Sequence, residues 1–208
     1  MRVAQRVWRE AGNSLAHLQP ITEENLQRLF IYLDRLIEAS LSATEPPPHF
    51  FISHKKENYQ RFGTLYPLEH FVVLFGELSA YRDDSHIAAW HVHNIEGNLW
   101  EVLTYIWRGE ATTLDGLHNE LNYRGISLDG YAKILQELMS RGWIKEGSGE
   151  YQLTAEGEKI RQEAEELTDR YFYTPWACLS DTEQEDLLSL ATQLRDGLLS
   201  SKELLVDK

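Results

Sequence analysis

Hydrophobic residues recur at intervals of three and four over most of the chain, which is the period of an amphipathic helix. In residues 22–41 this period gathers one apolar face, made of Leu26, Leu29, Phe30, Leu33, Leu36 and Ile37. Thr22 stands where an N-cap belongs, and Glu23 and Glu24 follow in the first turn, where carboxylates are stabilised by the helix dipole. We therefore predict a helix that begins directly after Thr22.

A proline-rich segment, residues 44–50, predicts a break after this helix. Residues 51–63 then have the pattern of a short helix that ends at its C-terminal glycine. Pro67 opens a strongly apolar segment, residues 67–81, because proline is favoured in the first turn of a helix. We expect this second helix to be mostly buried.

Residues 83–109 continue the helical pattern, and we expect either one long helix or two nearly continuous ones. Gly97 is the expected weak point, since glycine costs about 1 kcal/mol against alanine inside a helix. Gly109 is the expected stop, because glycine is favoured directly after the last helical turn.

Shorter units follow Gly109. Residues 112–125 predict a helix with Leu114, Leu117 and Leu121 inward. Residues 127–142 predict another, which Ser127 caps and whose inward residues are Tyr131, Ile134, Leu135 and Leu138. Residues 143–154 hold two strand-like runs joined by Gly-Ser-Gly, which predicts a β-hairpin. Helices followed by such a hairpin are the order of a winged helix, in which a helix-turn-helix is joined to a wing.

Two amphipathic segments end the chain. Thr154 is the expected cap of a helix over residues 155–173, which ends before Pro175 and turns inward Ile160, Ala164, Leu167 and Tyr171. Ser180 and Glu183 form a capping-box pattern before the last helix, whose apolar face holds Leu187, Leu190, Ala191, Leu194 and Leu198. These helices pack against the N-terminal ones or serve dimerisation, and the pattern leaves both open.

The predicted fold is mainly α: a helical N-terminal half, then a winged helix-turn-helix with a small β-hairpin wing, then C-terminal helices. We assign residues 1–96 to a helical N-terminal region with a candidate ligand pocket, and residues 97–155 to the winged helix-turn-helix. Residues 156–208 form the C-terminal helices, for packing or dimerisation. The chain is long enough for one large domain or two small ones.

Composition narrows the function classes. The formal net charge is −13, which argues against a general affinity for nucleic acid or anionic membranes. No apolar run approaches the roughly 18 residues of a membrane span, and the N-terminus lacks the apolar core of a signal peptide, so we expect a cytoplasmic protein. A single cysteine, Cys178, allows neither an internal disulfide nor a thiolate metal cluster.

Residues 80–94 gather one Arg, two Asp and three His, which raises the question of a metal site. His91 and His93 are two apart, so they point to roughly opposite sides of a helix. His86 and His93 share a face, but seven residues separate them by about 10 Å along the axis. One ion cannot bridge them, and a metal would need ligands from elsewhere, among His49, His54, His70 and His118. We therefore predict no metal.

The acidic residues of this segment have two explanations. Asp83, like Asp84 and Ser85 beside it, can cap the start of a helix. Alternatively, a ligand pocket lies here, with binding residues Arg82, Asp83, His86, Trp90 and His93. A contact between Asp83 and His86 would also resemble a general acid–base pair. No nucleophile elbow, phosphate loop or metal spacing accompanies it, so we predict no catalytic residues, no cofactor and no enzyme, with an activity at Asp83 and His86 as the minor alternative.

The predicted winged helix carries more acidic than basic residues between residues 98 and 155. DNA-binding proteins usually gather Lys and Arg on the recognition face, because phosphate neutralisation supplies most of the affinity. The candidate DNA-binding residues are Arg124, Ser127, Lys133, Gln136 and Lys145. The alternative is a winged-helix module that does not bind DNA and instead mediates protein–protein contact or small-molecule binding.

Three stretches carry a family resemblance, of which the first begins YRDDSHIAAWHVHN and the second SLDGYAKILQELMSRGWI. A third, L-T-x-x-G-x-x-x-R-x-x-x-E-x-x-T-D, runs from Leu153 to a Pro-Trp pair that ends at Trp176. Over residues 77–178 the chain resembles the SalK-like helix-turn-helix proteins, distant relatives of the MarR regulators. The resemblance implies an all-α winged-helix regulator. Taking the sequence as a whole, we expect a homodimer that binds a DNA operator, responds to a small-molecule ligand and has no membrane partner.

Overall fold

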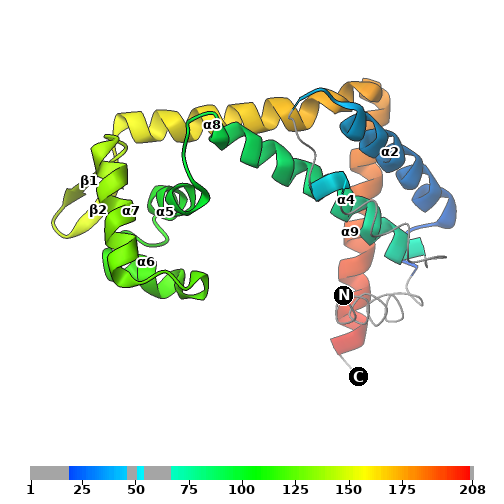
Figure 1. The fold of residues 1–208 in the computed structure, drawn as a ribbon. Helices are drawn as coiled ribbons and strands as arrows, with labels where there is room; N and C mark the ends of the chain where they lie inside the picture. Colours follow the sequence, from blue (N-terminus) through cyan, green and yellow to red (C-terminus); the bar gives the residue numbers. More distant parts are fainter. Residues whose placement is uncertain (1–18, 46–50, 54–66, 207–208) are drawn as a thin grey trace. The chain divides into compact units, whose positions relative to one another are not determined.

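A computed structural model of the chain describes residues 19–45, 51–53 and 67–206 (Figure 1). The chain divides into two compact units. The first holds the described residues up to Ser85 together with those from Arg170 onward, and the second holds His86–Asp169. Two helices, α4 (Pro67–His91) and α8 (Ala155–Tyr173), contribute residues to both units.

The first unit is built on α2, Glu23–Ser42, and confirms the helix predicted after Thr22. All six residues of its predicted apolar face are buried, and the Thr22 hydroxyl accepts a hydrogen bond from the Asn25 amide at 3.3 Å. Arg28 of α2 forms an ion pair with Asp186 of α9, which spans Asp181–Val206. The last helix therefore packs against the first described one, which is one of the two roles left open by its pattern.

The start of α9 confirms the predicted capping box. The Ser180 amide donates to the Glu183 carboxylate at 2.8 Å, and the Glu183 amide donates to the Ser180 hydroxyl at 3.4 Å. Hydrogen bonding from Arg35 of α2 and from the Ser180 amide lowers the pKa of Glu183 to about 2. Glu183 thus serves both the cap of α9 and its attachment to α2. Before it, α8 ends at Tyr173, as the proline at 175 predicts, and residues Thr174–Cys178 form the 3₁₀ helix η2.

Helix α4 corrects the expectation that Asp83, Asp84 and Ser85 mark a helix start, because α4 runs unbroken from Pro67 to His91. The buried Asp84 carboxylate accepts from the backbone amides of Phe51 and Ile52, at 2.9 and 3.1 Å. Ser85 donates its hydroxyl to the carbonyl of Tyr81 one turn earlier. Asp84 therefore caps helical residues 51–53 rather than its own helix, and the rest of the helix predicted over 51–63 lies outside the described residues.

Two helices, and not one, occupy the predicted segment 83–109. Helix α4 ends at His91 and α5 spans Gly97–Arg108. The backbone turns between them, with Asn94 in the left-handed region at a φ of 51°. Gly97 is thus the first residue of α5 and not a weak point within a helix, which corrects that expectation. Gly109 ends α5 with a φ of 68°, as predicted.

The second unit confirms the predicted winged helix-turn-helix (Figure 1). After α5 come α6 (Leu114–Glu120), the 3₁₀ turn η1 (Asn122–Arg124) and α7 (Leu128–Ser140). Strands β1 (Ile144–Gly147) and β2 (Glu150–Leu153) pair antiparallel, and both turn residues between them, Ser148 and Gly149, have positive φ. The hairpin is therefore the tight two-residue kind.

The core of this unit lies where α5, α6 and α7 meet the hairpin. Its most deeply buried side chains include Val102, Leu103, Leu117, Leu121, Tyr131, Leu135 and Leu138. Leu114 and Ile134, also predicted to point inward, are half-buried and pack at its edge. The predicted mainly α fold with a hairpin wing is confirmed. None of the helices in the described residues combines the length and the hydropathy that a membrane crossing requires.

Candidate functional site

Helix α7 has one face in the core and one at the surface. The Ser127 hydroxyl caps it by accepting from the Gly130 amide at 3.2 Å. Tyr131 and Leu135 point into the core, whereas Lys133 and Gln136 are exposed. The period of the helix thus places the two predicted DNA-facing side chains of α7 away from the core, where a ligand as large as a duplex can reach them.

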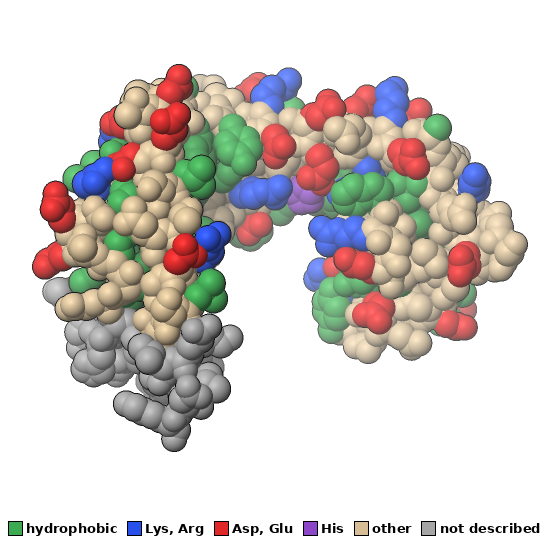
Figure 2. All heavy atoms as spheres, turned by 180° about the vertical axis from the view of Figure 1, so that it is seen from behind, with side chains coloured by type: hydrophobic (Ala, Val, Ile, Leu, Met, Phe, Trp, Pro, Cys, Tyr) green, Lys and Arg blue, Asp and Glu red, His purple; other side chains and the backbone are tan. Residues whose placement is uncertain are grey.

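The arginines around α7 are each engaged by an acceptor of the second unit. Arg141 donates to the Glu137 carboxylate at 2.6 Å and to the Asn94 carbonyl at 3.1 Å. Arg124 forms an ion pair with the Glu101 carboxylate. Lys145, on β1 of the wing, is exposed. On the face seen in Figure 2, Lys and Arg side chains lie scattered among Asp and Glu side chains rather than in one continuous basic surface.

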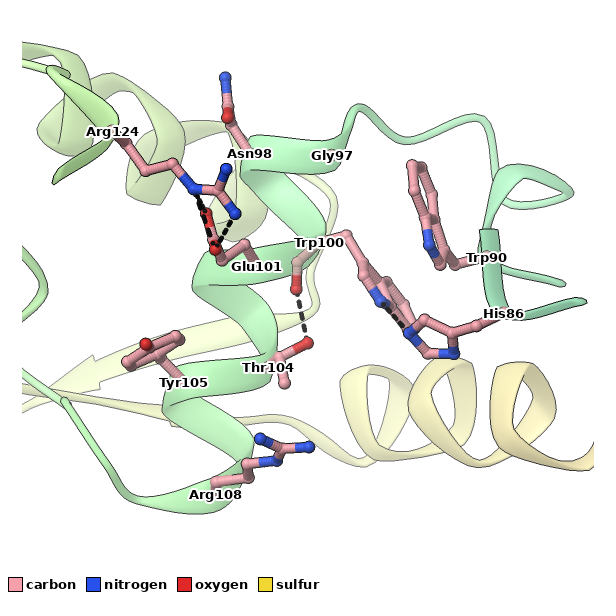
Figure 3. A pocket seen from close by; sticks show the side chains of 10 residues that line it. All are labelled: His86, Trp90, Gly97, Asn98, Trp100, Glu101, Thr104, Tyr105, Arg108 and Arg124. Carbon is pink, nitrogen blue, oxygen red and sulfur yellow. Dashed lines mark hydrogen bonds and ion pairs between the residues drawn. The ribbon is translucent and has the colours of Figure 1, made fainter. Parts of the chain in front are cut away.

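A pocket of about 440 Å³ lies along α5 in the second unit (Figure 3). Aromatic side chains line much of it. The rings of Trp90 and Trp100 are nearly parallel, with centroids 6.1 Å apart, and the Trp100 indole donates to His86 Nε2 at 3.2 Å. The remaining lining residues are mostly polar: Gly97, Asn98, Glu101, Thr104, Tyr105, Arg108 and Arg124. The pocket thus combines two indole rings with a mostly polar lining.

Glu101 and Arg124 form the polar wall of this pocket (Figure 3). Arg124 Nε lies 3.0 Å from Glu101 Oε2, and Arg124 Nη2 lies 2.6 Å from Glu101 Oε1, which is a two-pronged contact. The Tyr123 hydroxyl donates to the same carboxylate at 3.1 Å. Hydrogen bonding to Glu101 raises the pKa of the Arg124 guanidinium above its usual value. A predicted DNA-facing residue is therefore also part of the pocket wall.

Arg161 of α8, the arginine of the tail motif, is a buried cation for which the sequence patterns predicted no role. Its guanidinium carbon lies 4.2 Å from the ring centroid of Trp100 and 4.5 Å from that of Trp107, so the two indoles of α5 enclose it. Nη2 donates to Glu165 at 2.7 Å, while Nε and Nη1 have no hydrogen-bond partner among the described residues. Burial lowers the pKa of Arg161. Arg161 and Glu165 lie one turn apart in the tail motif, but no neighbouring residue in the sequence indicates the contacts of Arg161 with the two indoles.

Of the predicted ligand-binding residues, the structure brings His86 and Trp90 together in the pocket lining. Arg82 and Asp83 are exposed residues of α4 in the first unit. His93 is half-buried in the turn after α4, and its Nε2 has no hydrogen-bond partner in the described part of the chain. The predicted group is thus divided between the pocket and other surroundings.

Two further histidines each contact an aromatic ring of their own unit. The His70 ring is tilted against that of Phe30, with centroids 4.6 Å apart, and His118 meets Tyr131 in an edge-on contact. His49 and His54, which were candidates for a metal site, lie outside the described residues. Among the residues that the structure describes, no group of three or more His, Cys, Asp or Glu side chains is placed to hold a metal ion.

Comparison with known proteins gives one match. The model of a helix-turn-helix family matches residues 72–205, which includes all of the second unit. Searches of the curated proteins and of the solved structures found no match.

Proposed function

The chain belongs to a helix-turn-helix family, and from this premise we propose that it binds duplex DNA as a winged-helix, MarR-like transcriptional regulator. The resemblance of residues 77–178 to the SalK-like proteins supports this proposal. In a helix-turn-helix the second helix enters the major groove, and here that helix is α7. We propose a homodimer, since two-fold helix-turn-helix proteins read paired half-sites.

The observation that carries the proposal is the exposed face of α7. Lys133 and Gln136 are three residues apart on that face, so they lie about one turn apart and point the same way. A lysine can bond the acceptor edge of guanine, and a glutamine can form two bonds with adenine. Lys145 on the wing adds a cation at a position suited to a backbone phosphate. This pair of helix residues with a wing contact is the arrangement expected of a DNA reader.

A second candidate function is supported by the charge of the same unit. Asp129 is exposed in the first turn of α7, and Glu146 and Glu150 are exposed on the hairpin. These carboxylates would repel phosphates, whereas a basic protein surface would complement them. The alternative function is therefore a winged-helix module that binds a protein partner. Family membership supports a regulatory role over catalysis at Asp83 and His86.

We propose further that the pocket along α5 holds a small molecule. Trp90 and His86 offer flat surfaces, and Thr104 and Tyr105 offer hydroxyl groups for orientation. The pocket shares Arg124 with the turn before α7. A ligand there would contact the winged helix itself, which gives it a direct way to alter DNA binding.

The test is selection of duplexes from a random pool, followed by titration of the best duplex with anisotropy detection. Lys133→Glu is expected to weaken binding by at least about tenfold, because it removes a favourable charge and adds a repulsive one at the major groove. Lys159→Glu is the matched control: it makes the same charge change on an exposed side chain of α8 and should alter the affinity less than about twofold.

Two outcomes would count against the proposal. Selection that enriches no duplex would favour the protein-binding alternative. Undiminished affinity of a Lys133→Glu, Arg124→Glu double variant would show that the duplex meets another surface.

A further inference from the structure

The strongest unassigned feature is the donor pair that surrounds the Glu101 carboxylate. Arg124 and Tyr123 place three donor groups on it, namely Nε, Nη2 and the phenol hydroxyl. The Arg124 guanidinium also lies over the Tyr123 ring, 5.0 Å from its centroid, which holds the two side chains together. The donors are thus arranged for an anion with two oxygens on one side.

A phosphodiester presents the same two-oxygen edge as a carboxylate. The planar fork of arginine recognises both groups with two parallel hydrogen bonds. Tyr123 is 63% exposed, and the Arg124 side chain is 49% exposed, so both donors are open to a ligand from solvent. Arg124 comes three residues before Ser127, the cap of α7, so the donors stand next to the proposed recognition helix.

We infer that Arg124 and Tyr123 form a binding site for a DNA backbone phosphate, and that Glu101 occupies this site in the free protein as an internal competitor. The inference rests on the proposed function of α7. It adds a contact, Tyr123, and a restraint, Glu101, to that function. DNA binding then exchanges one anion for another at the same three donors.

A phosphate can replace Glu101 without leaving the Arg124 guanidinium unpaired, because it accepts the same two hydrogen bonds. The Arg124 side chain is 49% exposed and the Glu101 side chain 20% exposed, so water competes for the arginine and weakens the existing ion pair. A backbone phosphate gains in addition from the counterions that it releases. Glu101 has space to leave, because its side chain borders the pocket of about 440 Å³. In the free protein Glu101 thus holds Arg124 in place. It also lowers the affinity for any duplex, because the phosphate must first displace it.

The inference is tested by whether one substitution, Glu101→Gln, raises or lowers the affinity for DNA. In Glu101→Gln, the side chain keeps its size but loses its charge, so the donors are free for phosphate. We expect the affinity for the selected duplex to rise about fivefold, while the slope of log K against log salt stays nearly unchanged, because both proteins make the same phosphate contact. Glu163→Gln is the matched control: it breaks the Lys159–Glu163 pair on α8 with the same charge change, and should alter affinity less than twofold.

The second arm separates competition from a general charge effect. Arg124→Gln should weaken binding and make the salt slope shallower by about 1. Adding Glu101→Gln to Arg124→Gln should then bring no gain, since the competitor has lost its target. Thermal unfolding followed by circular dichroism verifies that each variant is folded.

Three results would overturn the inference. In the first, the wild type binds the duplex and Glu101→Gln binds it equally or more weakly. Glu101 is then not a competitor, and the proposed function is unaffected. In the second, Glu101→Gln raises the affinity for the duplex even in the Arg124→Gln background. The gain then comes from the lost negative charge in general and not from competition at Arg124. Absence of duplex binding by the wild type and every variant removes the inference and the proposed function together.

Discussion

Replacement of Arg161 by alanine is expected to lower the free energy of unfolding by about 3 kcal/mol. The Arg161 side chain is 2% exposed and lies between the rings of Trp100 and Trp107. Its removal loses both ring contacts and leaves a void between the indoles, which the helices α5 and α8 fill only in part. Urea unfolding followed by tryptophan fluorescence measures the change.

Arg161→Met separates packing from charge. Methionine refills most of the volume without a buried cation, and two of the guanidinium nitrogens have no hydrogen-bond partner among the described residues. We expect its unfolding free energy to lie within about 1 kcal/mol of the wild type. Lys159→Ala, on the exposed side of α8, should change it by less than about 0.5 kcal/mol. If Arg161→Ala were as stable as Lys159→Ala, the placement of Arg161 between Trp100 and Trp107 would be contradicted.

Replacement of Gly157 by alanine is expected to lower the free energy of unfolding by about 2 kcal/mol, although alanine is the better helix former. A Cβ at Gly157 would stand 2.0 Å from the carbonyl oxygen of Trp143, a backbone atom that cannot turn aside. The same oxygen accepts from the Thr154 amide at 2.9 Å, which fixes the start of α8 against β1. The added methyl group must therefore push the backbone of α8 away from the backbone at Trp143.

Gly147 provides the matched control for Gly157. It lies on β1 of the same hairpin, and a Cβ there would meet no atom within 4 Å in the described structure. Gly147→Ala should therefore leave the unfolding free energy unchanged or raise it slightly. Both substitutions are measured by urea unfolding. Equal effects at the two positions would show that α8 does not approach the Trp143 carbonyl closely.

The elements that sequence reasoning predicted well are those with local causes. The caps at Thr22, Ser127 and Thr154 each accept from an amide three residues later, so the bond and its pattern lie within one turn. The apolar period of α2 and of α7 is likewise a property of each helix alone. Such features need no knowledge of distant residues, and the winged-helix order followed from them.

The elements that it missed depend on residues far away in the chain. Asp84 looked like a cap for its own helix, whereas its carboxylate serves backbone amides 32 and 33 residues earlier. The break after His91 includes Asn94, a residue type that tolerates the left-handed region, whereas the predicted weak point lay three residues later, at Gly97. The error at Asp84 arose because a tertiary contact decides what this polar side chain does, and the sequence alone does not show that contact.

The candidate site shows the same division. Lys133 and Gln136 could be placed on the surface of α7 from its period. The pairing of Glu101 with Arg124 could not, because 23 residues and two turns separate them. Arg161 was hidden for the same reason, since its indole partners lie on a helix more than fifty residues earlier. Local patterns predicted the scaffold, and the polar contacts that bear on function needed the fold.

Hydrogen exchange of the full chain with and without its selected duplex tests the central claim most directly. We expect the duplex to slow exchange in residues 122–140, which hold the turn and α7, and in the hairpin at 144–153. Helix α9 should exchange equally fast in both states. A duplex that leaves α7 and the hairpin unchanged, while it protects another part of the chain, would contradict DNA recognition by this winged helix.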